Sequence, residues 1–500
     1  MWVPFTGSAC LLLVASMCSG LSSRSQELRY PPERIAVIGA GIGGTSAAYF
    51  LRQKFGKDVL IDVFERGTVG GRLATVNLKG EDYEAEGTSI HPLNLHMKHF
   101  VKELGIPGPK RQGGLMGIFN GDEFVFEESS WYIWNFIKLL WHYGLNPLRM
   151  HMWIEEILDK FMRIYQYQAH DYAFSSIESL LHALGGVELL QMLNQTIDES
   201  MQKSGFSQKF INEVVAGVMR EDFGQGTSIN GFVGTLSLAG DDPGLWSVEG
   251  GNKRVCSGLL QTSKAQQISG TVISIEEKTR QNGRSGGIVK LYEVTYDSTS
   301  GLEREAYDII MIATPLNHKS ANITFLNFNP PIPEFSKPYQ ETVATFVHGQ
   351  INASFFGYQH PSYFNLKHIV TVENSKLFIN SMVTLYPVKI RKDALNPQIW
   401  KIFSPQPLTK EQMDLLFISY DATRVKTWLA YPHYSPPEKC PPLILHSRMY
   451  YQNSIECLAS GMEMSAVSAQ NAALLAYHRW YVNTDMIDQE DLHERLKTEL

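Results

Sequence analysis

Cysteine is scarce in this sequence, with five residues among 500. Cys10 and Cys18 lie in an apolar stretch at the N-terminus, which leaves Cys256, Cys440 and Cys457 for the folded part of the chain. Three cysteines allow at most one disulfide bond, so the sequence excludes a small disulfide-stabilised scaffold. A chain of this length instead has enough residues for two or three domains with hydrophobic cores.

Excess positive charge is also missing. The chain has 44 Lys and Arg residues against 51 Asp and Glu residues, which gives a net charge of −7. Proteins that bind nucleic acids concentrate basic residues on one face, so no nucleic-acid partner is expected. No motif has the residue spacing of a metal site, and no metal ion is predicted.

The apolar run over residues 9–18 is too short for a membrane span, which needs about 20 apolar residues. Small residues follow it from Ser19 onwards, as in a secretory signal peptide, although no Lys or Arg precedes the run. We predict a signal peptide over residues 1–27. A buried N-terminal strand or helix is the alternative interpretation.

Three N-glycosylation sequons agree with a secretory route. They begin at Asn194, Asn322 and Asn352, and each has the Asn-X-Ser/Thr pattern. Such tripeptides also occur by chance, so glycosylation of the three asparagines is an expectation that depends on the signal peptide.

A βαβ pattern occupies the first portion of the mature chain. Apolar runs at residues 35–38 and 59–64 have the length of buried strands, and they flank a glycine-rich turn at 39–44 and a helical segment at 45–51. This order is typical of a dinucleotide-binding fold. A purely structural glycine-rich turn is the alternative interpretation.

Each position in this motif has a physical role. Gly39 permits the tight turn, Gly41 lets the backbone approach a diphosphate, and Gly44 allows close packing of helix and strand. The diphosphate is expected at the N–H groups and positive dipole of the helix N-terminus. Glu65, at the end of the second strand, is suited to accept hydrogen bonds from ribose hydroxyls.

The Gly70-Gly71-Arg72 sequence just after the second strand favours FAD over NAD. It resembles the FAD-binding fold of amine oxidases and carotenoid desaturases, in which the Arg faces the FAD diphosphate. The resemblance therefore implies FAD, with Gly71 and Arg72 among its ligands.

Further segments fit the same group. The loop at residues 83–91 is similar to one that passes beside the flavin ring, and within it Glu86 and His91 are candidates for a catalytic base. A helix at residues 461–473 is similar to one whose N-terminus is directed at the flavin. The predicted cofactor residues here are Val272, in a β meander that starts near residue 270, and Met462 and Glu463.

The segment Trp131–Tyr143 is unusually aromatic. Its polar members Asn135, Lys138 and His142 lie on one narrow helical stripe, and the rest of its surface is apolar. Packing in the core is the simplest prediction. The alternatives are that this helix lines a lipid-sized cavity, together with the helix at 151–167, or that it contacts a membrane surface.

The expected fold is an α/β Rossmann-like FAD-binding domain of the glutathione reductase and amine oxidase type, with an inserted mixed α+β substrate domain. The chain is predicted to enter the FAD-binding domain three times and the substrate domain twice. The predicted division is a signal peptide (1–27), an initial FAD-binding segment (28–95), a helical substrate-domain segment (96–245), a middle FAD-binding segment with the β meander (246–320), a further substrate-domain segment (321–440) and a C-terminal FAD-binding segment (441–500).

Four longer motifs narrow the resemblance. Val69–Thr75, Tyr165–His170, Trp246–Leu259 and Ala472–Tyr481 together resemble prenylcysteine oxidases, over nearly the whole mature chain. The resemblance implies FAD-dependent cleavage of S-farnesyl- or S-geranylgeranyl-cysteine by molecular oxygen in the lysosome. The implied products are free cysteine, a prenyl aldehyde and hydrogen peroxide.

Three functional classes therefore stay open. The first is an oxidase acting on prenylated cysteine, with FAD bound non-covalently and association with lipoproteins or a membrane surface. The second is another FAD oxidoreductase of the same fold, acting on amines or polyenes. The third is a lipid-associated relative with little turnover.

Overall fold

The computed structural model describes residues 30–107, 110–111, 114–240, 244–281, 288–317, 319–389, 399–490 and 492. The predicted signal peptide lies outside this range. All elements described below belong to one unit, Pro32–Leu500. Among the described helices, none has both the length and the apolar character needed to cross a bilayer.

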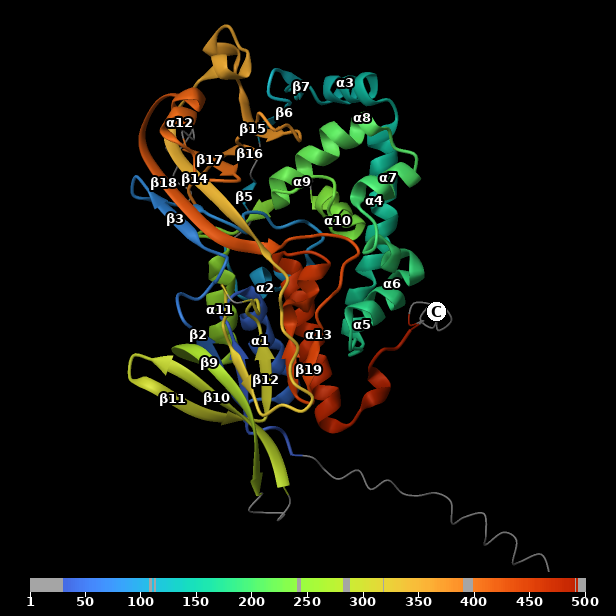
Figure 1. Ribbon diagram of the computed structural model, residues 1–500, viewed down its shortest axis with the longest axis vertical. Coiled ribbons are helices and arrows are strands. Elements are labelled where there is room, and N and C mark those ends of the chain that lie inside the picture. The colour runs from blue at the N-terminus through green and yellow to red at the C-terminus, as the bar shows by residue number, and fades with distance from the viewer. Residues whose placement is uncertain are drawn as a thin grey trace, which may run out of the picture. The chain divides into compact units, whose positions relative to one another are not determined.

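The predicted dinucleotide-binding motif lies in a nine-stranded sheet (Figure 1). Its strands are β1 (Arg34–Ile38), β2 (Leu60–Glu65), β9 (Gln266–Gln281), β10 (Ile288–Ser298), β11 (Gly301–Tyr307), β12 (Ile309–Ile312), β13 (Thr324–Leu326), β19 (Ile444–His446) and β20 (Met449–Tyr451). Strands β9, β2, β1, β12 and β20 are parallel and adjacent in that order. β10 and β11 continue the sheet beyond β9 as the predicted antiparallel meander.

Helices cover the parallel strands. They are α1 (Ile42–Phe55), α2 (Leu95–Glu103), α11 (Lys253–Ser263) and α13 (Met462–Tyr481). α1 packs against both α11 and α13, and the three helices share one hydrophobic core with β1 and β2. Since β1 is covered by apolar neighbours and its residues 35–38 are buried, a continuous apolar run is what this position requires. The predicted fold class is confirmed.

A second, seven-stranded sheet combines two distant regions of the chain. Its strands, in spatial order, are β18 (Phe417–Pro432), β14 (Tyr339–Ile351), β17 (Ile399–Ser404), β16 (Ser381–Leu385), β15 (Leu366–Thr371), β6 (Leu115–Phe119) and β7 (Phe124–Glu127). An Asn-Gly pair between two apolar runs predicts a β-hairpin, and Asn120-Gly121 joins β6 to β7 as this pattern predicts. β6 pairs in parallel with β15, which lies about 250 residues later in the sequence.

The segment between β7 and β9 is largely helical, as predicted. It contains α3 (Tyr132–Tyr143), α4 (Asn146–Met162), α5 (Ile164–Ala169), α6 (Ile177–Met192), α7 (Ile197–Lys203), α8 (Gln208–Phe210), α9 (Ala216–Phe223) and α10 (Gly231–Gly240). The smaller elements are β3 (Thr75–Leu78), β4 (Glu81–Glu84), β5 (Lys110–Arg111), β8 (Trp246–Ser247) and α12 (Lys410–Leu416). The domain division given above remains a prediction.

The sequence predicts a capping box from Ser175 to Glu178, and this prediction is wrong by one residue. The N-cap of α6 is Ser176, whose Oγ accepts a hydrogen bond from Ser179 N at 3.0 Å. Ser175 instead donates through its backbone N–H and its hydroxyl to Asp488. The alternative partner Asp488 comes from the far end of the chain, so local sequence spacing could not reveal it.

The prediction that α3 packs in the core is also wrong. Tyr143 is its one buried residue, whereas Trp134 is 51% exposed and Trp141 is 92% exposed. Ile133 and Ile137, on the same side of the helix, are exposed as well. A helix normally turns its apolar face to the protein, so α3 is inverted relative to an ordinary surface helix.

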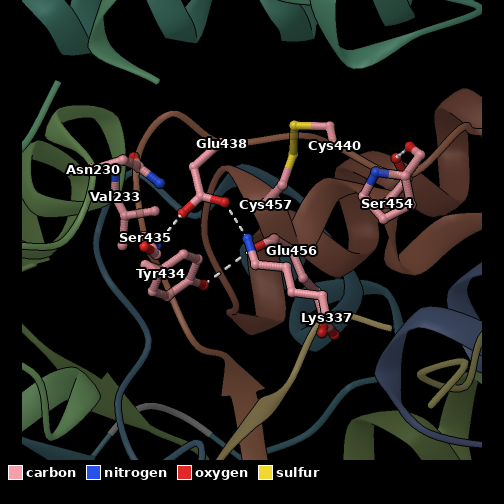
Figure 2. The surroundings of a disulfide bond; sticks show 11 residues. Asn230, Val233, Lys337, Tyr434, Ser435, Glu438, Cys440, Ser454, Glu456 and Cys457 are labelled. Carbon is pink, nitrogen blue, oxygen red and sulfur yellow. Dashed lines mark hydrogen bonds and ion pairs between the residues drawn. A yellow bond between two sulfur atoms is a disulfide. The ribbon is translucent and has the colours of Figure 1, made fainter. Parts of the chain in front are cut away.

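Within the described residues, one disulfide bond, Cys440–Cys457, connects the loop after β18 to the turn after β20 (Figure 2). It agrees with the expectation of at most one bridge. Beside it, Lys337 forms an ion pair with the buried carboxylate of Glu438, and Tyr434 donates its hydroxyl to the carbonyl of Glu456 at 3.0 Å (Figure 2).

Reduction of this disulfide is expected to destabilise the protein. The two cysteines are 17 residues apart, and closing a loop of that length restricts the unfolded chain by about 3 kcal/mol in the chain-entropy model. We expect dithiothreitol to lower the denaturant midpoint of the wild-type protein. A Cys440→Ala/Cys457→Ala variant should have a lowered midpoint that dithiothreitol does not change; equal midpoints for reduced and oxidised wild type would contradict the assignment.

Candidate flavin site

The turn after β1 leaves no room for side chains at two of the predicted glycines. Gly39 has φ of +105°, and a Cβ built on it would lie 2.9 Å from the carbonyl oxygen of Ala313. A Cβ on Gly44 would lie 1.8 Å from the carbonyl oxygen of Gly39. Helix α1 therefore approaches the turn after β1 so closely that only glycine fits at position 44.

Gly41 differs from these two, because the protein itself leaves space there. A Cβ on Gly41 would meet the carbonyl oxygen of Gly70 at 3.7 Å and the Cα of Gly71 at 4.0 Å, which are ordinary contacts. The backbone N–H of Gly70 donates to Ala40 O at 2.9 Å and holds the second loop against the first. Gly41, Gly70 and Gly71 lie together at the N-terminus of α1 with no side chains of their own, and we call these three residues the glycine cradle.

A buried amide lies next to the first turn of α1. Gln452 is 3% exposed, yet neither its Nε2 nor its Oε1 has a hydrogen-bond partner among the described residues. A Cβ on Gly43 would lie 3.4 Å from this Oε1, so the amide lies against the start of α1. Burying an unpaired amide costs about 1–3 kcal/mol, which a polar ligand in the cradle would recover. The residues present therefore fit a dinucleotide diphosphate.

Two predicted cofactor residues lie near the end of β2. Glu65 accepts a hydrogen bond from Ala40 N at 2.9 Å through Oε2 and one from Gly67 N at 2.8 Å through Oε1. Its strand partner is Ser269 on β9, and the buried Val272 follows three residues later on the same strand. The contact of Glu65 with a ribose stays a prediction.

Arg72, the residue predicted to face the diphosphate, forms an ion pair with the buried Glu456. It also donates to the carbonyl oxygen of Ala430 and, at 3.2 Å, to Ser460 Oγ. Glu456 accepts a further hydrogen bond from the hydroxyl of Tyr339 at 2.7 Å. Arg72 therefore connects the glycine cradle to β18 of the seven-stranded sheet.

The start of α13 is tied to α2. The carboxylate of Glu463 accepts hydrogen bonds from His96 N at 2.7 Å, from Met97 N at 3.0 Å and from the hydroxyl of Tyr165 at 2.7 Å. These protein donors give Glu463 a helix-capping role in the structure. Its role toward a cofactor stays a prediction.

The two candidate bases have different surroundings. His91 lies in the turn that precedes α2, where its Nδ1 accepts a hydrogen bond from Leu93 N at 3.1 Å. Glu86 is directed to the interior, and a Cβ on the next residue, Gly87, would lie 3.8 Å from the sulfur of Met462. Glu86 is therefore adjacent to the start of α13, where the flavin ring is expected.

Glu86 belongs to a buried charged cluster with Glu84, Lys401 and Lys426. Burial raises the pKa of Glu86 to about 7, an effect that the nearby Arg72 opposes. Burial likewise raises the pKa of Glu84 to about 7 and lowers that of Lys401 to about 8. Groups of opposite charge with pKa values brought toward neutrality are a common feature of functional sites.

Sequence reasoning missed two members of this site. Lys401 is 3% exposed and lies on β17, in the apolar run Ile-Trp-Lys-Ile-Phe. A lysine inside an otherwise buried strand was the signal available for it. Gln452 had no comparable signal, because a glutamine after a strand is common on protein surfaces.

A small cavity opens beside Glu86. Its volume is about 60 Å³, and its lining includes Arg220, Gln340, Trp428 and Tyr431. That is room for about four water molecules, so it suits a small polar group better than a long hydrocarbon chain. The guanidinium of Arg220 donates to Thr371 Oγ1 at 3.2 Å and to the carbonyl oxygen of Ile379 at 3.0 Å, which fixes its orientation.

A second cavity, of about 580 Å³, lies beside the disulfide and includes Phe335, Tyr339 and Tyr451 in its lining. The lining residues of these two cavities include none from α3. The alternative in which α3 lines a lipid-sized cavity therefore receives no support from either of them.

The two sheets, the glycine cradle and the unpaired buried amide define a flavoprotein of the amine oxidase fold. Cyclohexylamine oxidase from Brevibacterium oxydans has a similar fold, with a TM-score of 0.56 and 14% identity, over 90% of this chain and 99% of that one. A model of NAD(P)-binding Rossmann-like domains matches residues 37–104.

The chain belongs to the prenylcysteine lyase family, whose model matches residues 126–489. It is 59% identical to Prenylcysteine oxidase 1 of Homo sapiens over 99% of this chain and 98% of that protein. It is 43% identical to human Prenylcysteine oxidase 1-like, over 98% of this chain and 99% of that protein.

Proposed function

We propose that this protein is an FAD-dependent oxidase that cleaves the thioether of S-prenyl-L-cysteine. The observation that carries the proposal is the 59% identity to human Prenylcysteine oxidase 1, which extends from end to end of both chains. The lower identity of 43% to the 1-like protein favours the oxidase over a relative with little turnover. The glycine cradle, which a bulkier residue at position 41 would fill, supports retention of the cofactor.

The overall reaction converts the prenylated thioether, dioxygen and water into prenyl aldehyde, free cysteine and hydrogen peroxide. FAD held at Gly41, Gly70 and Gly71 would supply a hydride acceptor for the carbon attached to sulfur and a route for the electrons to dioxygen. That carbon is allylic and next to a sulfur lone pair, so positive charge on it is stabilised. The protein contributes orientation and exclusion of bulk water, and no nucleophilic side chain is required.

The cavity beside Glu86 is our candidate site for the cysteine head group. The substrate carries an ammonium and a carboxylate, which require a buried acid and an Arg. Glu86 and Arg220 line the same cavity of about 60 Å³, and no hydrogen bond from a described residue reaches Glu86 Oε2. Glu86 would receive the ammonium group and Arg220 the carboxylate.

The state of the cysteines supports non-covalent attachment of FAD. Cys440 and Cys457 lie nearest in the sequence to the C-terminal FAD helix. They form a disulfide with each other, so neither has a free thiol. Cys256 is buried, and burial raises the pKa of its thiol to about 12, which suppresses the reactive thiolate.

The proposal also covers location. The protein enters the secretory route, reaches the lysosome and associates with a lipid surface. A disulfide is typical of proteins that fold in an oxidising compartment, which supports this route. The side chains of Asn194 and Asn322 are accessible to solvent, as N-glycosylation requires. Asn352 is half-buried, and its Nδ2 donates to Leu415 O at 2.9 Å.

The function is tested by incubating the purified protein with S-farnesyl-L-cysteine in air. We expect farnesal, free cysteine and hydrogen peroxide in equal amounts. An oxidase for amines would release ammonia or an amine and no free cysteine. A carrier without turnover would leave the flavin oxidised when substrate is added without oxygen, and either outcome would contradict the proposal.

A further inference from the structure

The exposed side of α3 is apolar, and exposed apolar residues follow it at the start of α4. Ile133, Ile137 and Trp141 are spaced four residues apart and share one face of α3, and Trp134 lies beside them. Three further exposed apolar residues continue the surface at the end of α3 and along α4. We call this set the aromatic face; its members are Ile133, Trp134, Ile137, Trp141, Leu145, Leu148 and Met152.

The orientation of α3 is fixed by its polar stripe, which points into the protein. Asn135 accepts a hydrogen bond from Ser129 N at 2.6 Å and donates to Ser129 O at 2.8 Å. Lys138 donates to the carbonyl oxygen of Glu127 at 3.0 Å, and His142 lies 3.3 Å from the carboxylate of Glu213. The polar side chains, with Tyr143 and Leu139, hold the helix to the protein, and most of its other apolar side chains are left to solvent.

A helix of this kind needs an apolar partner. Monomeric proteins rarely expose a contiguous apolar patch of this size without a binding function. Three tryptophans and one tyrosine lie between residues 131 and 141, and these residue types concentrate at membrane–water interfaces, where one end of the ring is apolar and the other hydrated. With 12 residues, α3 is about 18 Å long, which is suited to lying in an interface and too short to span it.

The aromatic face carries no acidic side chain. Residues 129–153 include Lys138 and Arg149, together with two histidines, and contain no Asp or Glu. Insertion of the aromatic face into the surface of a bilayer would therefore bury no carboxylate of this segment.

We infer that the aromatic face docks this protein on a phospholipid bilayer, with α3 lying parallel to the membrane plane. The inference gives a location to the lipid-surface association proposed above, and it does not depend on the enzymatic reaction. Because a prenylated cysteine partitions into membranes, docking would bring the protein to the layer that holds a lipid substrate.

Vesicle co-sedimentation tests this inference directly. We expect the wild-type protein to bind vesicles of phosphatidylcholine. A Trp134→Ser/Trp141→Ser variant should have a partition coefficient at least tenfold lower. Tyr363→Ser is the matched control, since this aromatic side chain is 72% exposed outside the aromatic face, and it should bind like wild type.

Circular dichroism and flavin content would establish that the variants are folded. If the double variant does not fold, the single variant Trp141→Gln, at the most exposed position, should still lower the partition coefficient. Absence of vesicle binding by the wild type would overturn the inference, as would equal binding by wild type and tryptophan variants. A dimer in light scattering that the tryptophan substitutions dissociate, without vesicle binding, would assign the aromatic face to a second copy and also overturn it.

Discussion

Substitution of Gly41 by Val should abolish flavin retention and leave the fold intact. The backbone at Gly41 is extended, with φ of −74°, a conformation that a β-branched residue adopts readily. The first protein atom beyond a Cβ there is 3.7 Å away, so the side chain would occupy the space left for the diphosphate. Overpacking costs about 1–3 kcal/mol, or about 5- to 150-fold in affinity.

Gly44→Ala provides the contrasting control. Its added methyl group would lie 1.8 Å from a backbone oxygen of the turn after β1, so strand and helix would have to move apart. We therefore expect Gly44→Ala to lower the melting temperature of the flavin-free protein, whereas Gly41→Val leaves that temperature unchanged. Flavin absorbance after gel filtration measures how much flavin each variant retains. Normal flavin content in Gly41→Val would show that the glycine cradle is not the cofactor site.

Substitution of Glu86 by Gln should reduce kcat/KM for farnesylcysteine by about 100-fold. The proposed role of this carboxylate is to hold the substrate's ammonium, and loss of one partner from a buried charge pair typically costs 2–5 kcal/mol, or about 30- to 5000-fold. Wild-type enzyme should strongly prefer the free amine to N-acetyl-S-farnesylcysteine, which has no positive charge. The Glu86→Gln variant should lose most of that preference.

The pH profile gives an independent measurement of the same group. Because burial raises the pKa of Glu86 to about 7, its carboxyl is protonated in more acidic solution, and kcat/KM should fall as the pH decreases below about 7. A bound ammonium favours the ionised carboxylate, so the corresponding limb in kcat should lie at lower pH. In Glu86→Gln the limb in kcat/KM should disappear.

Glu84→Gln is the matched control for both measurements. Its pKa is also raised to about 7, but its carboxylate accepts a hydrogen bond from Asn252 N at 2.6 Å and holds the start of α11. We expect this variant to lose stability and to keep both the amine preference and the acid limb. If Glu84→Gln removed the limb and Glu86→Gln kept it, the head-group site would be misassigned.

The sequence predicted those regions of the fold that local patterns determine. The βαβ motif, the Asn120-Gly121 hairpin and the β meander each depend on residues close together in the chain, and the structure confirms all three. Long-range partners changed the details, as when Asp488 engages Ser175 and shifts the helix cap by one position.

The candidate site was predicted less completely for the same reason. Gln452 and Lys401 come close to the N-terminal loops from about 300 to 400 residues away, and no spacing rule connects such positions. Periodicity also identified the two sides of α3 correctly, yet it could not tell which side faces the protein. That choice depends on the partners Ser129, Glu127 and Glu213, whose positions only the assembled fold defines.

The nine-stranded sheet has a consequence for the order in which this protein matures. β1 is made near the start of the chain, β12 near its middle and β20 within the last 52 residues, yet the three are neighbours. The glycine cradle therefore meets Gln452 and the start of α13 only when synthesis is almost complete. A nascent chain that ends before β20 would therefore lack part of the cofactor site and would have an open sheet edge at β12, where aggregation can begin.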